Sequence, residues 1–418
     1  MIIPVMQLTG ASDAVPPVSS LPRDIDALIS KLMISGHLII QFADPSQHVM
    51  LEAVLAKYSV ILDLGHLELS EALGWLNKGA GRVFVHSRDE DYVSQLPKGR
   101  TVMDVTEDIK ECGDSAPAIF DLLGKMLSVW QGLCDLFFVR LPFELTAEQH
   151  ADMLAQLSTS KGEHTRFIFA TPTPTCEHVA LHDQWGCDSA ADLTVLGVSL
   201  DLGEAIAAPM QPDRPDRLVP TCVVDEQGVC LGMVYSNMES IREAVACGLG
   251  VYHSRKRGLW RKGLTSGDTQ VLLRIDWDCD RDTLRFTVRQ HGRGFCHLAT
   301  RTCFGPEAGL GALMRTLEER RAAAPAGSYT HRLYTDEELL HSKIREEAQE
   351  VVDATTPNDV AWETADLMYF ALVKCVKAGV SLADVERQLD RRALKVFRRP
   401  GNAKPQFMPP RQDPPPPS

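Results

Sequence analysis

His37-Leu-Ile-Ile-Gln-Phe42 and Val60-Ile-Leu-Asp-Leu64 are short apolar runs that read as buried strands, with a helical pattern over Gln47–Tyr58 between them. Further strand-like runs follow at Val83-Phe-Val-His86, Asp135-Leu-Phe-Phe-Val-Arg-Leu141 and Arg166-Phe-Ile-Phe-Ala170. Helical patterns fall at Glu68–Gly79 and Thr146–Leu157. Repeated βα units favour a parallel sheet or a barrel, so we expect a barrel-like α/β domain over residues 1–210.

The same region offers little that indicates catalysis. It has no glycine-rich phosphate loop and no clustered histidine and acidic residues. His66, His86, His150 and Cys187 stand isolated in the sequence, and a structural role is expected for each. We therefore predict that residues 1–210 form a non-catalytic domain.

Composition indicates a cytoplasmic protein of several domains. A chain of 418 residues is too long for one ordinary core, and its net charge of −13 argues against a nucleic-acid-binding surface over the whole molecule. No signal peptide is legible, and no run approaches the about 18 apolar residues of a membrane span. The 11 cysteines are scattered and odd in number, which favours reduced thiols, some of them metal ligands, over a disulfide framework.

Changes in composition divide the chain. The proline-rich stretch Ala207–Pro215 marks a boundary, after which strand-like runs dominate and one helix is expected at Ser240–Gly248. The strand-like runs are Thr221–Val224, Cys230–Tyr235, Gln270–Ile275 and Leu284–Val288. The predicted domains after residue 210 are a β-rich α+β domain (214–305), a connector (306–328), an all-helical domain (329–406) and a Pro-rich tail (407–418).

Three aspartates alternate in the β-rich part. Asp278, Asp280 and Asp282 would share one face of a strand or tight bend, and carboxylate oxygens suit a hard cation such as Mg²⁺. An EF-hand loop is excluded, because its sixth position would be Thr283 instead of Gly and its twelfth Arg289 instead of Glu. A solvated acidic strand edge remains the alternative interpretation.

Cysteines accompany these acids. Cys279, Cys296 and Cys303 are 17 and 7 residues apart, unlike the paired cysteines of zinc ribbons. Three thiolates without an obvious fourth partner suit zinc with an open, catalytic position, although buried structural cysteines are the alternative. His297 directly follows Cys296 and could act as a general acid/base beside the metal, or be an ordinary surface histidine.

A basic segment, residues 254–267, lies upstream of these aspartates and cysteines. Cations neutralise phosphate, glycine lets backbone N–H groups approach an anion, and Trp260 offers a stacking face for a base. A short RNA-binding patch is the competing interpretation, and the acidic net charge disfavours it. The predicted substrate-binding residues are Arg255, Trp260, Lys262, Thr265, Ser266 and Gly267, with Lys256, Arg257 and Arg261 adding charge.

Together these motifs carry a resemblance. Trp260-Arg-Lys-Gly-Leu-Thr-Ser-Gly267, Asp278-Cys-Asp-Arg-Asp282 and Cys296-His297 with Cys303-Phe304 resemble the signature of phosphoribosyl-AMP cyclohydrolase. The resemblance implies zinc on the three cysteines, shared across a homodimer interface, and magnesium on the three aspartates. It also implies hydrolytic opening of the adenine ring between N1 and C6. Leu298-Ala299 departs from the Thr-Gly of many bacterial members and is similar to the fungal version.

The last block of the sequence contains helix start and stop signals that are typical of a helical bundle. Capping patterns occur at Thr335 with Glu338, at Thr356-Pro357 with Asp359, and at Ser381 with Asp384. Gly379 suits a C-cap between the second and third of these helices.

Acidic residues on two of these helices form the second candidate site. Glu346, Glu347 and Glu350 share one sector of the first helix, and Glu363 and Asp366 are i, i+3 neighbours on the second. Solvated acidic faces are the alternative. The pattern is similar to the magnesium site of all-α nucleotide pyrophosphohydrolases. Tyr329-Thr-His-Arg-Leu-Tyr334 and the run 343–404 resemble, more narrowly, phosphoribosyl-ATP pyrophosphatase.

That second resemblance implies Mg²⁺-dependent release of pyrophosphate, with Glu347 central to catalysis and Lys343 or Arg345 near the phosphates. The two activities are successive, so the sequence predicts a bifunctional histidine-biosynthesis hydrolase acting on phosphoribosyl-ATP and phosphoribosyl-AMP. The layout matches bacterial fusions and a fungal trifunctional protein, whose histidinol dehydrogenase part would lie beyond Ser418. The alternatives are a general nucleotide pyrophosphohydrolase with a structural zinc domain, and a non-catalytic metal-stabilised scaffold.

Overall fold

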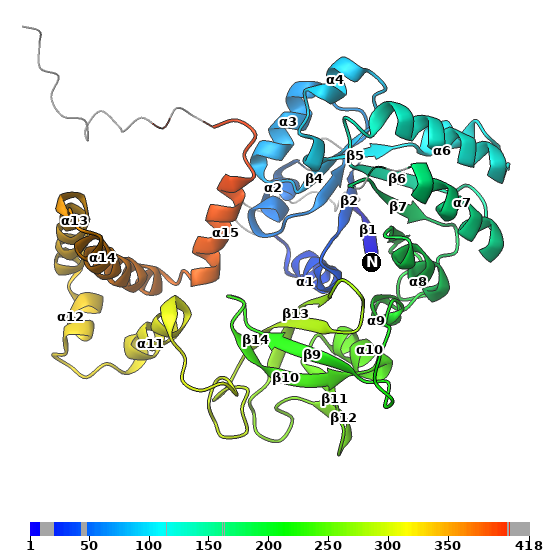
Figure 1. Cartoon of the computed structure of the whole chain (residues 1–418). Helices are drawn as coiled ribbons and strands as arrows, with labels where there is room; N and C mark the ends of the chain where they lie inside the picture. Colours follow the sequence, from blue (N-terminus) through cyan, green and yellow to red (C-terminus); the bar gives the residue numbers. More distant parts are fainter. Residues whose placement is uncertain are drawn as a thin grey trace, which may run out of the picture.

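Among the residues that the structure describes, eight parallel strands form a closed barrel at the N-terminal end of the chain (Figure 1). The computed structural model describes residues 1–8, 21–42, 48–113, 115–160, 162, 164–398 and 401. The barrel-like α/β arrangement expected from the sequence is therefore confirmed. The strands are β1 (Ile2–Leu8), β2 (Ile39–Phe42), β3 (Ile61–Asp63), β4 (Arg82–Val85), β5 (Thr101–Asp104), β6 (Leu136–Arg140), β7 (Arg166–Ala170) and β8 (Asp188–Asp192).

The barrel has an inner and an outer apolar layer. Alternate strand residues point inward, where Phe84 and Phe138 pack edge to face with ring centroids 5.1 Å apart. The intervening residues point outward and pack against helices that surround the barrel (Figure 1). These helices are α1 (Arg23–Leu32), α2 (His48–Lys57), α3 (Leu69–Lys78), α4 (Glu90–Ser94), α5 (Thr106–Lys110), α6 (Ala116–Trp130), α7 (Ala147–Ser160), α8 (Cys176–Gln184) and α9 (Leu202–Ala207).

Two histidines that stand isolated in the sequence have close partners in the fold. The ring of His86 lies between two carboxylates, with Nε2 2.9 Å from Asp63 Oδ1 and Nδ1 3.3 Å from Asp104 Oδ2. His150 is buried, and its Nε2 lies 3.2 Å from Nε2 of His182. Sequence spacing hides these contacts because the partners come from neighbouring strands and helices.

Within the described residues, the middle of the chain forms a six-stranded sheet in the order β12-β11-β10-β9-β14-β13. Neighbouring strands are antiparallel except β14 and β9, which are parallel. This confirms the β-rich central part. The elements are β9 (Val219–Val224), β10 (Cys230–Ser236), α10 (Met238–Cys247), β11 (Val251–Ser254), β12 (Gly258–Arg261), β13 (Gln270–Trp277) and β14 (Leu284–Gln290).

The C-terminal part is all helical, as expected, and has its own apolar core around Leu333, Leu340 and Val373. No helix in the described residues is long and apolar enough to cross a membrane. The predicted Pro-rich tail 407–418 lies outside the described residues. The helices are α11 (Gly309–Ala323), α12 (Tyr329–Thr335), α13 (Glu337–Asp353), α14 (Pro357–Ala378) and α15 (Leu382–Ala393).

Most of the predicted helix boundaries of this bundle hold. Ser381 and Asp384 form a reciprocal capping box, Thr356 caps α14, and Gly379 ends α14 in the left-handed conformation. The prediction for α13 is wrong by one residue: Asp336 is its N-cap, because its carboxylate accepts from the backbone N–H of Leu339. The segment expected to be a connector contains α11, which packs into the bundle core.

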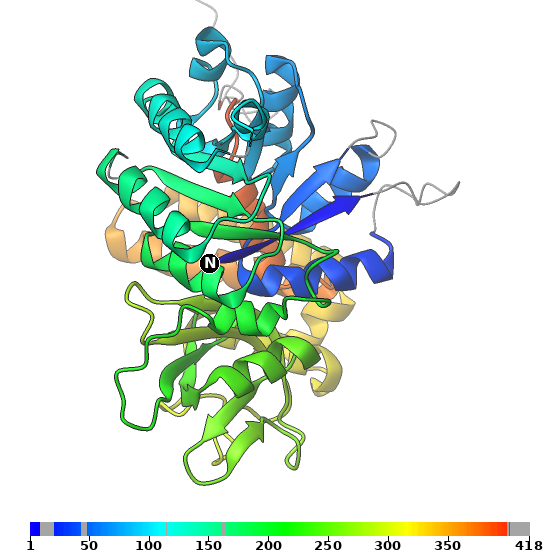
Figure 2. The same cartoon turned by 90° about the vertical axis from the view of Figure 1, so that its right-hand side faces the viewer.

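The barrel contacts both other parts. Trp277 at the end of β13 donates from Nε1 to the carbonyl of Ile206 in α9 at 2.8 Å, which joins the sheet to the barrel. The backbone N–H of Val396, just after α15, donates to Oδ1 of Asn77 in α3 at 2.9 Å. Figure 1 shows α15 between the other helices of the bundle and the barrel, and Figure 2 shows the barrel above the six-stranded sheet.

Candidate metal and substrate sites

The bend between β13 and β14 gathers the three predicted aspartates. Asp278, Asp280 and Asp282 each offer an oxygen, and these oxygens lie within 4.8 Å of one another. The Thr283 hydroxyl donates to Asp282 and favours its charged form, but burial and the charges of Asp280 and Asp278 give Asp282 a raised pKa. A hard divalent cation among these oxygens would remove the repulsion, so the donor set fits Mg²⁺.

Arg281 secures this bend, a role that the sequence pattern does not reveal. Its φ of 66° lies in the left-handed region, which is uncommon for a non-glycine residue. Nη1 donates to the carbonyl of Asp278 at 2.6 Å, and the rest of the guanidinium pairs with Asp183 of α8. The spacing of residues along the sequence could not predict this role of Arg281, because its partner Asp183 belongs to the barrel.

Two of the predicted zinc ligands, Cys296 and Cys303, lie together beside β10. A Cβ added at Gly232 would come 3.2 Å from the Cys303 thiol, so the absence of a side chain there lets the cysteine segment approach the strand. Burial and the neighbouring Cys296 thiol raise the pKa of Cys303 to about 11. The backbone N–H of Leu298 is the main cause that lowers the pKa of Cys296.

The third thiol, Cys279, is exposed and lies 3.9 Å from the Asp280 carboxylate. In the part of the chain that the structure describes, no group of three or more ligating side chains within reach of one ion includes a thiol. One copy of the chain therefore presents two cysteines in one place and the third elsewhere. His297 is exposed next to the pair, with its Nδ1 3.9 Å from Cys296 Sγ.

The predicted substrate-binding segment covers the β11–β12 hairpin and the following turn. Lys262 is buried, and its ammonium donates to the carbonyls of Asp268 (3.1 Å) and Gly294 (3.4 Å). Burial lowers the pKa of Lys262. Trp260 packs on Tyr252 with ring centroids 6.0 Å apart. The residues of this set that are exposed are Arg255, Thr265, Ser266 and Gly267.

Helices α13 and α14 bring their acidic residues together. Glu346, Glu347 and Glu350 form one group, and Glu347, Glu363 and Asp366 form a second, each with oxygens within 4.8 Å. Glu347 belongs to both groups and is only 4% exposed. Burial, followed by the charges of Glu347 and Glu363, raises the pKa of Glu350. This arrangement fits one or more divalent cations.

Lys343 supplies positive charge beside these acids. Its Nζ lies 2.7 Å from Glu347 Oε1 and 2.9 Å from Glu346 Oε1, and these hydrogen bonds raise the pKa of Lys343. The same ammonium lies over the ring of Phe370, 5.4 Å from its centroid. Arg345 points from the exposed surface of α13.

The β-rich part and the helical part each match a known family model. Residues 232–305 match the family model described as phosphoribosyl-AMP cyclohydrolase, and residues 310–393 match the one described as phosphoribosyl-ATP pyrophosphohydrolase. The first match encloses the aspartate bend and the cysteines, and the second encloses α13 and α14. Fold and sites thus define a fusion of these two domain families.

Curated relatives are histidine biosynthesis proteins. The bifunctional protein his7 of Schizosaccharomyces pombe is 55% identical over 205 residues, 49% of each chain. The trifunctional protein of Saccharomyces cerevisiae is 49% identical over 209 residues, 50% of this chain and 26% of that protein. The bifunctional protein HisIE of Gloeobacter violaceus is 39% identical over 191 residues, 42% of this chain and 88% of that protein.

The chain therefore belongs to the family of bifunctional histidine biosynthesis proteins that includes the Gloeobacter protein. It spans half or less of the length of the fungal relatives that it matches.

Proposed function

We propose that the chain catalyses two successive hydrolytic steps. The helical bundle releases pyrophosphate from phosphoribosyl-ATP, and the β-rich part opens the adenine ring of the resulting phosphoribosyl-AMP between N1 and C6. The observation that carries the proposal is that each family match encloses its own group of carboxylates, on different elements of the fold. The catalytic units proposed are residues 214–305 and 329–406.

For the bundle, we propose a Mg²⁺ site on Glu346, Glu350, Glu363 and Asp366, with Glu347 shared. When bound, Mg²⁺ neutralises phosphate oxygens and makes an attacking water more acidic. The buried Glu347 carboxylate would accept the proton of that water. Lys343 and the exposed Arg345 would contact the diphosphate, because both lie on the helix that carries the acids.

For the β-rich part, we propose zinc held by thiolates of Cys279, Cys296 and Cys303. Thiolates suit zinc, which when bound supplies a water with a pKa of about 7. Cys279 lies apart from the other two within one chain, so the complete set would need a second copy of the chain in a homodimer. The thiols must be reduced, which fits a cytoplasmic location.

The remaining residues of this part would position the substrate. Attachment of ribose at N1 makes C6 of the ring electrophilic, as in the attack on C6 of adenine by zinc deaminases. His297, beside Cys296, would transfer the proton between water and ring nitrogen. Asp278, Asp280 and Asp282 with Mg²⁺, together with Arg255 and the turn after β12, would hold the phosphate.

A turnover assay with phosphoribosyl-ATP, Mg²⁺ and Zn²⁺ tests both steps, with pyrophosphate and the ring-opened product followed separately. We expect both products from the wild-type chain. Cys296→Ser should abolish ring opening and spare pyrophosphate release, and Glu347→Gln should do the reverse. Cys247→Ala and Glu338→Gln alter an exposed thiol and an exposed acid outside the two sites and should change neither step.

The proposal fails if a single substitution abolishes both steps in folded protein, or if neither product forms. Preference for ordinary nucleoside triphosphates would point instead to a general pyrophosphohydrolase. Zinc content without ring opening would leave the cysteines a structural role.

A further inference from the structure

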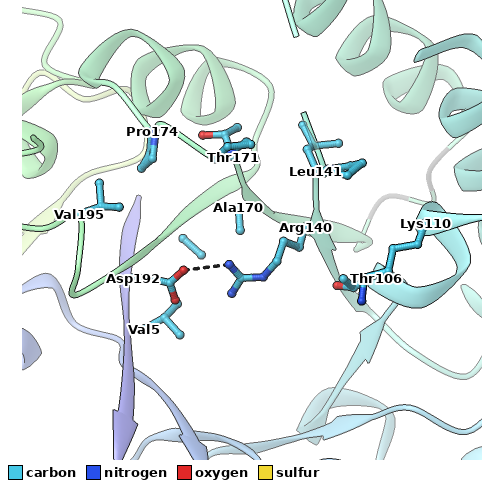
Figure 3. A pocket seen from close by; sticks show the side chains of 13 residues that line it. Val5, Thr106, Lys110, Arg140, Leu141, Ala170, Thr171, Pro174, Asp192 and Val195 are labelled. Carbon is cyan, nitrogen blue, oxygen red and sulfur yellow. Dashed lines mark hydrogen bonds and ion pairs between the residues drawn. The ribbon is translucent and has the colours of Figure 1, made fainter. Parts of the chain in front are cut away.

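A cavity opens at the C-terminal mouth of the barrel, away from both sites described above. Its volume is about 310 Å³, and it lies where β6, β7 and β8 end (Figure 3). Closed barrels of parallel strands bind ligands at this face, and their phosphate sites commonly follow the seventh and eighth strands. The position alone makes the cavity a candidate site, so its lining decides what it could bind.

An ion pair spans the cavity. Arg140, the last residue of β6, reaches across to Asp192, the last residue of β8, with Nη1 2.9 Å from Oδ2 (Figure 3). Both side chains are 34% exposed, so the pair faces open space. Within the described residues only Nη1 of this guanidinium is hydrogen-bonded, which leaves further N–H groups for a ligand. Lys110, at the end of α5, adds a second cation to the wall.

A hydroxyl in the same wall lacks a partner. Thr171, which follows β7, is 9% exposed, and its Oγ1 has no hydrogen-bond partner among the described residues. Buried polar groups are nearly always hydrogen-bonded, and an unsatisfied one is destabilising. Oγ1 itself is covered, but Thr171 lines the cavity, so rotation about its Cα–Cβ bond would turn the hydroxyl toward a polar atom of a ligand.

A chain of hydrogen bonds connects the opposite side of the mouth with the cavity wall. Gln41 donates to Asp63 at 2.9 Å, and His86 bridges Asp63 to Asp104. The hydroxyl of Thr106, which lines the cavity, donates to Asp104 at 2.5 Å. Because its proton is committed to Asp104, the oxygen of Thr106 is held as an acceptor beside Lys110.

We propose that this cavity binds a small polyhydroxylated anion. Its phosphate or carboxylate would lie beside Lys110 and Arg140. The Lys110 ammonium pairs with exposed Glu107 at 2.6 Å, as the Arg140 guanidinium pairs with Asp192, and both cations keep further N–H groups for the anion. Its hydroxyl groups would donate to Asp192 and Thr106 and bond with Thr171. The apolar walls, which include Val195, suit the carbon chain of such a molecule.

Calorimetric titration of the full chain with ribose 5-phosphate, gluconate and ribose tests this proposal. We expect ribose 5-phosphate or gluconate to bind, and neutral ribose to bind at least about tenfold more weakly. Lys110→Met should weaken binding about tenfold or more, and Thr171→Val several-fold. Thr171→Val keeps the side-chain shape and removes a hydroxyl without a partner, so its thermal midpoint should not fall.

The sites proposed for the phosphoribosyl substrates could also take ribose 5-phosphate, so the variants locate the binding. Lys125→Met removes an exposed cation on α6 and should bind like the wild type. Both cavity variants should retain pyrophosphate release and ring opening, which separates this test from that of the proposed function. The preferred anion identifies the phosphate or the carboxylate as the recognised group.

Three outcomes would overturn the proposal. The first is no binding of either anion at millimolar concentration. The second is equal binding of ribose. The third is binding that Lys110→Met and Thr171→Val both leave unchanged.

Discussion

Arg281 and Asp183 form a two-point ion pair between the aspartate bend and the barrel. Arg281 Nε lies 2.7 Å from Asp183 Oδ2, and Nη2 lies 2.7 Å from Oδ1. The Asp183 side chain is only 7% exposed, so the pair is shielded from water and has the parallel geometry of a strong charge-assisted contact. The barrel thereby fixes the bend that carries Asp278, Asp280 and Asp282.

We predict that Asp183→Asn loosens the bend. The amide cannot neutralise Arg281, so the free energy of unfolding should fall by about 3 kcal/mol, measured by urea unfolding. The Mg²⁺ concentration that half-saturates ring opening should rise several-fold, while that for pyrophosphate release stays constant. Asp216→Asn, which breaks the exposed pair with Arg214, is the matched control and should have little effect. An unchanged Mg²⁺ requirement in Asp183→Asn would argue against this role of the barrel.

A second prediction concerns the repulsion within the bundle. Glu350→Gln should raise the metal-free thermal midpoint by a few degrees, because Glu350 is crowded by Glu347 and Glu363. The pKa of Glu350 is raised in the folded state, so the metal-free bundle loses stability as pH rises through that pKa. The gain from the substitution should therefore be larger at neutral than at acid pH.

The same variant should lose most of the rise in midpoint that Mg²⁺ gives the wild type. Glu338→Gln, on an exposed position of the same helix, controls for a general loss of acidic charge. A lower metal-free midpoint in Glu350→Gln would contradict the repulsion argument.

The barrel should be acid-sensitive through its buried histidines. Burial and the nearby His178 lower the pKa of His150 to about 4, and burial lowers that of His182 well below its ordinary value. Between about pH 6.5 and about pH 4 these histidines are protonated in the unfolded chain but stay neutral in the folded chain. The free energy of unfolding therefore falls as pH falls. Urea unfolding across this range should show the loss. His150→Gln should flatten it, whereas exposed His164→Gln should not; equal slopes would refute the assignment.

The attachment of α15 to the barrel gives a fourth prediction. Oδ1 of Asn77 accepts from the backbone N–H groups of Val396 (2.9 Å) and Phe397 (3.0 Å). Asn77→Ala removes both bonds, so trypsin should cleave after Lys395 several-fold faster, as followed by mass spectrometry. Asn358→Ala, at an exposed position of α14, should leave the rate unchanged. The same rate in both variants would mean that these bonds do not hold the segment.

The sequence predicts those parts of the fold that depend on local patterns. Apolar runs such as Arg166–Ala170 identify β7 correctly. The sequence does not predict β8, because Asp188-Ser-Ala-Ala-Asp192 has small side chains between two aspartates and no run of large apolar residues. Yet β8 closes the barrel by pairing with β1, from the other end of the domain. Closure is a non-local property, and periodicity carries no information about it.

Local sequence patterns likewise predict some features of the candidate sites and not others. The acids of α13 and the alternating aspartates could be grouped from the sequence, because the helix period places the former on one side and the latter lie close together in one short bend. The separation of Cys279 from Cys296 could not, since it depends on how two loops fold. Nor could the burial of Lys262, whose ammonium is engaged by two backbone carbonyls from different segments.

Because α15 returns to the barrel, the helical bundle contacts both the sheet and the barrel. The bundle is pinned at one end near the sheet, where Arg315 of α11 lies 3.9 Å from Asp225, and at the other by Asn77. Contacts at both ends restrict the motion of the bundle relative to the sheet and the barrel more than the chain connection alone would. Moving its acidic helices nearer to the cysteines would therefore require one of these contacts to change.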